Sequence, residues 1–238
     1  MKNIFFERLR KVSRELLWLA YPVVCPMCGR TMLSSETIVC THCFTEISDS
    51  EQMKAASTSI LRKFDGTFEI ESATAFSVYN ENEVVKELIH ELKYNNKKEI
   101  GFELGKAFAN SMLQTFETTC YDAFIPIPLH PGKEKQRGYN QSYWIAKGLA
   151  SVLNKDVYQY AVVRTVNTES QTKKNREERN NNMKGVFALN DCKELENKHI
   201  VVVDDVLTTG ATIANCCNVL AEIPNIRISI MAIAISGN

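Results

Sequence analysis

The chain has 238 residues, 45% of them hydrophobic, and its 28 Lys and Arg are balanced by 28 Asp and Glu. This length and composition support one large domain with a real core, or one such domain with a small appendage. The zero net charge excludes a global field that attracts nucleic acid or membranes, so any polyanion binding must be local. No uncharged apolar run approaches about 18 residues, and no membrane span is therefore expected.

Residues 1–20 are predicted to form an amphipathic helix. Apolar residues recur near helical spacing among charged ones, at Ile4, Leu9, Val12, Leu16 and Leu19. Charges spread through this stretch exclude a secretory signal. Packing against the rest of the protein is the favoured interpretation, and docking on a membrane surface or a partner is the alternative.

Residues 21–47 contain two CxxC units, Cys25 with Cys28 and Cys40 with Cys43. Two such knuckles can offer four thiolates in the tetrahedral arrangement that zinc prefers, and the short spacer predicts a compact zinc ribbon. With four thiolates no coordination position is open, so the zinc is expected to be structural. A redox CxxC is the alternative, and it is disfavoured because two copies lie close together without a preceding core strand.

The remaining cysteines are scattered along the chain, and Cys216 and Cys217 are adjacent on a predicted helix. This usage is typical of a cytoplasmic chain with a metal site and unpaired thiols, and it argues against a disulfide framework.

Residues 48–238 alternate predicted strands with predicted helices, after a polar stretch at 45–70 interpreted as a linker with one short helix. Strands are expected at 72–79, 123–127, 157–164, 184–189, 200–203 and 227–235. Helices are expected at 84–92, 100–116, 211–221 and from a cap at Asn140 to about Leu153. This alternation indicates a parallel α/β sheet flanked by helices, with its ligand at the carboxyl ends of the strands.

Two polar segments of this region are candidate anion sites. The loop at 128–140 follows a core strand and carries Lys133, Lys135 and Arg137, although a solvated basic loop is the alternative. The stretch 165–182 lacks hydrophobic anchors, which is typical of a lid over an active site. Its polar and cationic residues are Gln171, Lys173, Lys174, Arg176 and Arg179. A disordered surface loop, or a grip on a nucleic-acid backbone, are the alternatives for this stretch.

The segment from His199 to Thr212 carries the strongest signal. Ile200 to Val203 has the composition of a central strand, and this strand is expected to stop at Asp204 and Asp205. A turn at 206–210 and a helix from Ala211 would then aim free amides and a helix dipole at one point. The expected phosphate cradle consists of Val206, Leu207, Thr208, Thr209, Gly210 and Thr212. No Lys follows the glycine, so this is not a Walker A loop.

Bare carboxylates repel phosphate, so the two aspartates make sense if they accept hydrogen bonds from the vicinal hydroxyls of a ribose. The arrangement resembles the 5-phosphoribosyl 1-pyrophosphate (PRPP) motif of type I phosphoribosyltransferases. By that resemblance Asp204 and Asp205 hold the ribose, and the cradle holds its 5-phosphate. The resemblance also implies pyrophosphate bound by Lys133 and Arg137 with Mg²⁺, and a lid that brings Arg176 and Arg179 to the departing pyrophosphate.

Taken together, the motifs resemble the ComF family over nearly the full length. They are the cysteine knuckles, the pair Lys93 and Tyr94, PIPLHP with RGYNQ at 126–141, the segment from Gln171 to Phe187, and VVVDDVLTTGAT at 201–212. The resemblance implies a PRPP-binding fold that serves DNA uptake beside a helicase and a DNA-processing protein. Glutamine amidotransfer is not expected, because the first cysteine belongs to a knuckle and the N-terminal nucleophile is missing.

Three hypotheses follow. The favoured one is a DNA-uptake accessory that contacts single-stranded DNA or partners through basic loops and the zinc module. Its ligand would be PRPP or another ribose phosphate, such as a nucleotide phosphate. The others are an active phosphoribosyltransferase on an unidentified acceptor, and a regulator that binds PRPP without turnover. The motif does not separate catalyst from sensor, because phosphoribosyl transfer needs no protein nucleophile. Tyr139, Tyr143 and Trp144 adjoin the basic loop but are expected to pack on the helix.

Overall fold

The computed structural model divides the chain into two compact units, Met1–Glu46 and Ile47–Asn238. It describes residues 22–34, 36–47, 50–64, 69–79, 82–115, 121–165, 186–190 and 192–236. The expected helix over 1–20 therefore lies outside the described residues, as do Arg176 and Arg179 of the expected lid. Among the described residues, no helix combines the length and the hydropathy needed to cross a membrane.

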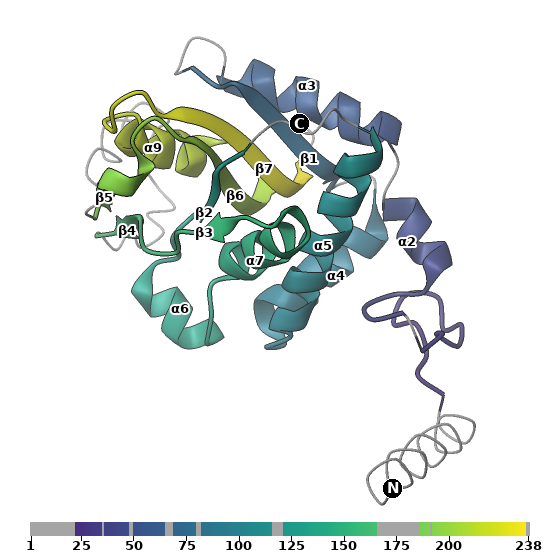
Figure 1. Cartoon of the computed structure of the whole chain (residues 1–238). Helices are drawn as coiled ribbons and strands as arrows, with labels where there is room; N and C mark the ends of the chain where they lie inside the picture. The colour runs from purple at the N-terminus through teal and green to yellow at the C-terminus, as the bar shows by residue number, and fades with distance from the viewer. Residues whose placement is uncertain are drawn as a thin grey trace, which may run out of the picture. The chain divides into compact units, whose positions relative to one another are not determined.

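The second unit is built on a five-stranded sheet with the order β1-β7-β6-β2-β3 (Figure 1). All its paired strands are parallel, which confirms the expected α/β architecture. The strands are β1 (Ser72–Val78), β2 (Ala123–Pro126), β3 (Asp156–Val157), β6 (His199–Leu207) and β7 (Arg227–Ile235). A separate antiparallel pair joins β4 (Val162–Arg164) to β5 (Phe187–Leu189).

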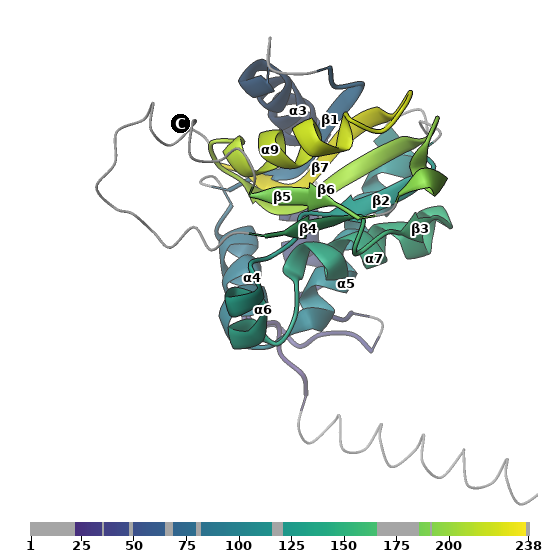
Figure 2. The same cartoon turned by 90° about the vertical axis from the view of Figure 1, so that its left-hand side faces the viewer.

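Helices cover both faces of this sheet (Figure 2). On one face lie α3 (Ser50–Phe64) and α9 (Ala211–Leu220), and on the other α4 (Glu83–Tyr94), α5 (Lys98–Thr115) and α7 (Gln141–Leu153). Apolar side chains from α3, α9 and the sheet form one buried cluster that includes Phe64, Ile213 and Val202. Because both faces are covered, residues 200–203 of β6 are all buried, as their continuous β-branched run predicts.

The expectation that β6 stops at the aspartates is wrong. The strand continues to Leu207, because its pairing with β7 extends through Asp204 opposite Ala232 to Leu207 opposite Ile235. Both carboxylates therefore lie within the last part of a central strand, and the turn that follows is confined to residues 208–210.

The linker predicted for 45–70 is also wrong, because most of this stretch is helical: α2 (Thr41–Ile47) is followed by the 15-residue helix α3. Met53, Ala56, Ile60 and Phe64 recur at helical spacing and are buried. This buried apolar face was not recognised in the sequence because polar residues lie between its members and because Ala56 is small.

Two further expectations fail locally. Residues 157–164 do not form one strand, because a turn at Ala161, whose amide donates to the Tyr158 carbonyl, separates β3 from β4. The loop expected at 128–140 contains a short helix, α6 (Pro131–Arg137), which has proline at its start and the left-handed Gly138 at its end. The Asn140 cap of α7 is confirmed, since its side-chain oxygen accepts from the Ser142 amide at 3.0 Å.

Candidate functional site

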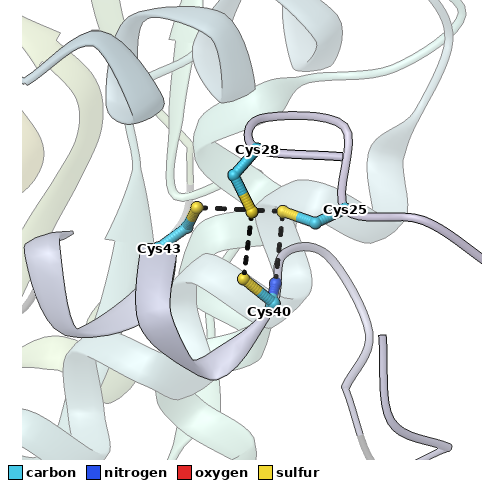
Figure 3. Close-up of side chains that lie close together, drawn as sticks. All are labelled: Cys25, Cys28, Cys40 and Cys43. Atoms are coloured by element: carbon cyan, nitrogen blue, oxygen red, sulfur yellow. Dashed lines mark hydrogen bonds between the residues drawn. The ribbon is translucent and has the colours of Figure 1, made fainter. Parts of the chain in front are cut away.

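Four cysteines of the first unit converge on one point (Figure 3). Their sulfur atoms all lie within 4.8 Å of one another, with Cys25 Sγ 3.8 Å from Cys43 Sγ and Cys28 Sγ 3.5 Å from Cys40 Sγ. A tetrahedral zinc site with Zn–S bonds of about 2.3 Å has sulfur separations of about 3.8 Å. The donor set and spacing therefore fit structural zinc, and the cluster agrees with the zinc-ribbon module expected from the sequence.

A tight turn positions the first knuckle. The Gly29 amide donates to the Cys25 carbonyl at 2.9 Å, and Gly29 has a φ of 70°, which favours glycine. The second knuckle brackets the start of α2, and the Cys40 amide donates to Cys25 Sγ at 3.4 Å. Burial raises the pKa of the Cys25 thiol, but hydrogen bonds from backbone amides, foremost that of Cys40, outweigh it and lower the pKa to about 6. Cys25 thus favours the thiolate that a metal requires.

In the second unit, the two aspartates of β6 are held by different helices. Asp204 Oδ1 accepts from Ser142 Oγ of α7 at 3.1 Å and from the Asp205 amide at 2.9 Å. Asp205 Oδ2 lies 3.2 Å from Lys93 Nζ at the end of α4, and its Oδ1 accepts from the Val206 amide at 2.6 Å. The structure therefore fixes both carboxylates at the carboxyl end of a central strand, where α/β sheets bind ligands.

These contacts leave the two carboxylates electrostatically unequal. Burial, and then the charge of Asp205, raise the pKa of Asp204 to about 7. Asp205 has the compensating ammonium of Lys93 as its direct partner. Near neutral pH Asp204 is therefore shared between a carboxylate, which accepts hydrogen bonds, and a carboxylic acid, which can also donate one.

The turn after β6 presents exposed donors. Thr208 and Thr209 are exposed, and Gly210 adopts a left-handed φ of 78° as the residue before α9. Gly210 has no side chain to cap this helix; Thr209 Oγ1 accepts from the Ala211 amide at 3.4 Å, and the amides of residues 208–210 have no acceptor among the described residues. Free amides at a helix N-terminus are suited to an anion. The Val206 amide, by contrast, is occupied by Asp205.

The end of α3 braces this turn. Lys63 Nζ donates to the Thr208 carbonyl at 2.9 Å, and the Phe64 ring packs so closely on Gly210 that a Cβ there would lie 2.8 Å from Phe64 Cζ. Glycine is therefore required at 210 for both its φ and its contact with Phe64. Sequence reasoning missed Lys63 and Phe64 because their segment was interpreted as a linker.

The expected basic loop lies on α6, beside the end of α4. Lys133 is exposed, and the guanidinium of Arg137 lies 5.6 Å from the centroid of the Tyr94 ring. Neither cation makes a described contact with the aspartates.

The sequence did not predict Lys93 and Ser142 as site residues. For Lys93 the only signal was the Lys93-Tyr94 pair in the family resemblance. For Ser142 the sequence offered no signal.

Comparison with known proteins agrees with this geometry. Residues 140–234, which include the aspartates and the turn, match the family described as the phosphoribosyl transferase domain. The competence protein ComFC of Bacillus subtilis is 29% identical over 211 residues, covering 84% of this chain and 72% of that protein. The competence protein F of Haemophilus influenzae is 27% identical over 151 residues, covering 62% of this chain and 66% of that protein. Together these similarities support a ComF-family protein.

A relative with a different name is also similar to this chain. The DNA utilization protein YhgH of Shigella flexneri is 33% identical over 136 residues, which are 56% of this chain. The chain spans 59% of the length of that relative. The ComF resemblance noted in the sequence is thereby confirmed.

Proposed function

We propose that this ComF-family chain binds PRPP at the carboxyl end of β6 and acts in DNA uptake. The observation that carries the proposal is the pair of held carboxylates, Asp204 and Asp205, directly before a turn whose amides have no described acceptor. In the proposed complex the aspartates accept hydrogen bonds from the ribose hydroxyls. The 5-phosphate lies on the turn at 208–210 and the start of α9, with Thr208, Thr209 and Thr212.

The remaining parts of the substrate are assigned by charge. Lys133 and Arg137 are proposed to bind the pyrophosphate, and Arg176 and Arg179 to reach it from the segment beyond β4. Mg²⁺ prefers hard oxygen ligands, so the pyrophosphate and ribose oxygens, oriented by Asp204 and Asp205, suit it. When bound, it would neutralise charge on the pyrophosphate; the aspartates only orient the sugar.

The role in DNA uptake is supported by the names of the relatives, which refer to competence and to DNA utilization. We propose contacts with single-stranded DNA and with a DNA-uptake helicase, in the cytoplasm. Outside the zinc cluster, the described Cys216 and Cys217 are buried free thiols, and the Cys192 thiol donates to the Ala161 carbonyl at 3.2 Å; this supports a reducing compartment.

Calorimetry with PRPP and Mg²⁺ tests the proposed ligand. We expect saturable binding by the wild type and its loss in the double variant Asp204→Asn with Asp205→Asn. Asp156→Asn, at an exposed aspartate on β3, is the matched control and should bind normally. No heat and no thermal stabilisation of the wild type by PRPP with Mg²⁺ would remove the proposal.

An active phosphoribosyltransferase is the second candidate, favoured by one observation: the raised pKa of Asp204 allows a proton to be held beside the sugar near neutral pH. Release of pyrophosphate from PRPP in the presence of candidate bases or amines, abolished by Asp205→Asn, would establish it. Tight PRPP binding without release for any acceptor would instead indicate a PRPP-responsive regulator.

A further inference from the structure

An exposed tyrosine lies at the rim of the proposed PRPP site. Tyr94 ends α4, is 65% exposed, and follows Lys93, the ion-pair partner of Asp205. The centroids of the Tyr94 and His90 rings are 4.9 Å apart. The guanidinium carbon of Arg137 lies 5.6 Å from the centroid of the Tyr94 ring. Much of the hydrophobic Tyr94 ring is therefore in contact with water, and the ring is flanked by the ionisable His90 and the cationic Arg137.

A second aromatic ring flanked by cations, that of Trp144, lies beside the start of α5. Lys98, the first residue of α5, places Nζ 4.9 Å from the centroid of the Trp144 ring, and Lys147 places Nζ 5.0 Å from the same centroid. The Tyr143 ring contacts Trp144 edge-on at 5.9 Å between centroids. Both lysines are exposed.

The two rings belong to one continuous surface. Only residues 95–97 separate Tyr94 from Lys98, so their Cα atoms are at most about 14 Å apart. Gly138, next to Arg137, faces Asn96 of this connection, since a Cβ on Gly138 would lie 3.6 Å from Asn96 Oδ1. We call this surface the basic-aromatic strip and define it as Tyr94, Lys98, Trp144 and Lys147; Arg137, proposed above as a pyrophosphate ligand, borders the strip at Tyr94.

The strip has unmatched positive charge. Lys97 pairs with Glu91, and Lys106 pairs with Glu103 at 3.1 Å, so these neighbouring charges cancel. Within the described part of the chain, no carboxylate forms an ion pair with Lys98, Lys147 or Arg137. The exposed Glu99 is the acidic residue nearest in sequence to Lys98, and it offsets one of these three charges.

The Tyr94 ring is exposed and the Trp144 ring is half-buried. Solvent-accessible rings beside unmatched cations are a combination that binds single-stranded nucleic acid. Bases stack on the rings without regard to sequence, and the cations bind the phosphates between them. We propose that the basic-aromatic strip is the single-stranded DNA interface, an inference that rests on the DNA role proposed above.

The position of the strip also determines its relation to the PRPP site. Ser142, which contacts Asp204, and Trp144 are two residues apart on α7, so they lie about 200° apart around the helix. DNA stacked on Trp144 therefore leaves the aspartates open, while Tyr94 brings the strand to the rim of the site. The two ligands bind together and do not compete.

Fluorescence anisotropy with labelled oligo-dT and the full chain tests the strip. Tyr94→Ala should weaken binding at least about fivefold, and Tyr94→Phe should retain it, because the stacking face remains. Tyr160→Ala is the matched control: Tyr160 is 68% exposed in the turn between β3 and β4, and this variant should bind like the wild type. Equal affinity of Tyr94→Ala and the wild type would overturn the assignment.

Salt dependence tests the cations. The pair Lys98→Gln with Lys147→Gln should lower the slope of log affinity against log salt by about 1.4, since each single-strand phosphate contact contributes about 0.7. The exposed pair Lys193→Gln with Lys198→Gln removes the same charge elsewhere and should leave the slope unchanged. Equal slopes for the two pairs would overturn the role of the lysines.

Further measurements distinguish a failure of the strip assignment from a failure of the proposed DNA role. The chain has two tryptophans, so in a Trp18→Phe background oligo-dT should quench the fluorescence of Trp144. PRPP affinity should be unchanged in the Lys98 and Lys147 pair, and saturating PRPP should not displace the oligonucleotide. If the wild type binds no oligonucleotide, the proposed DNA role is wrong. If the oligonucleotide binds but PRPP displaces it, or the fluorescence of Trp144 does not change, only the assignment of the strip is wrong.

Discussion

At the scale of single residues, Asp204, the proposed ribose ligand, lowers the stability of the fold at neutral pH. Its folded-state pKa of about 7 lies above the ordinary value of 3.8, first because its carboxyl group is desolvated and then because Asp205 is charged. The folded state therefore binds more protons than the unfolded state between these two values, and stability from this group decreases as pH rises through that window. Groups that weaken the fold in this way are common at functional sites.

Asp204→Asn should therefore stabilise the ligand-free protein at pH 8 while abolishing PRPP binding. Asparagine keeps an oxygen for Ser142 and removes the buried charge, and we expect a gain of roughly 1–3 kcal/mol at pH 8. The gain should shrink at pH 5, where the wild-type group is already protonated in the folded state. Urea unfolding at both pH values measures it, and a loss of stability at pH 8 would contradict the assignment.

His199 should make the fold sensitive to acid. Its side chain is buried with Nε2 2.8 Å from Ser229 Oγ, and burial, followed by the charge of Arg227, lowers its pKa below 6.5. The unfolded state then binds more protons, so stability is complete above pH 6.5 and is lost as pH falls toward the folded-state pKa. In urea titrations, we expect the His199→Gln variant to lose less stability than the wild type between pH 7 and pH 5.5. An identical loss would exclude His199 as the source of the acid sensitivity.

At the scale of elements, the contact between α5 and α7 depends on two glycines. A Cβ on Gly148 would lie 2.0 Å from the Phe102 carbonyl oxygen, and one on Gly105 would lie 2.2 Å from the Ile145 carbonyl oxygen. The helix backbones therefore touch at this crossing. The contact holds α7, and with it Ser142, at a fixed distance from the sheet.

Gly148→Ala should destabilise the protein by roughly 2–3 kcal/mol, although alanine is the better helix former by about 1 kcal/mol. The control is Gly132→Ala on α6, where the nearest atom to a new Cβ is the His130 ring at 3.2 Å, a side chain that can move. Thermal unfolding compares the two variants. Equal midpoints would show that the helices can separate without cost.

At the scale of the whole molecule, the two units should respond separately to metal removal. Because structural zinc contributes folding energy directly, a chelator should unfold the first unit. Alkylation by iodoacetamide, followed by mass spectrometry, should then modify Cys25, Cys28, Cys40 and Cys43. Cys216 and Cys217, which are buried residues of α9, should stay protected. Loss of that protection would mean that the second unit depends on the metal.

The sequence predicted those parts of the fold that rest on local pattern. The β-branched run of β6, the cysteine spacing and the Asn140 cap each specify their structure within a few residues. The helix α3 was missed because its buried stripe is diluted by polar residues and alanine. The partners of the aspartates, Lys93 and Ser142, lie far away in the chain, and only the parallel packing of α4 and α7 on the sheet brings them to β6.

A crystal structure of the complex with PRPP and Mg²⁺ tests the central claim most directly. We expect the 5-phosphate on the amides of residues 208–212 and the ribose hydroxyls on Asp204 and Asp205. A sugar phosphate bound elsewhere, or a turn that stays closed by its own side chains at saturating ligand, would contradict it.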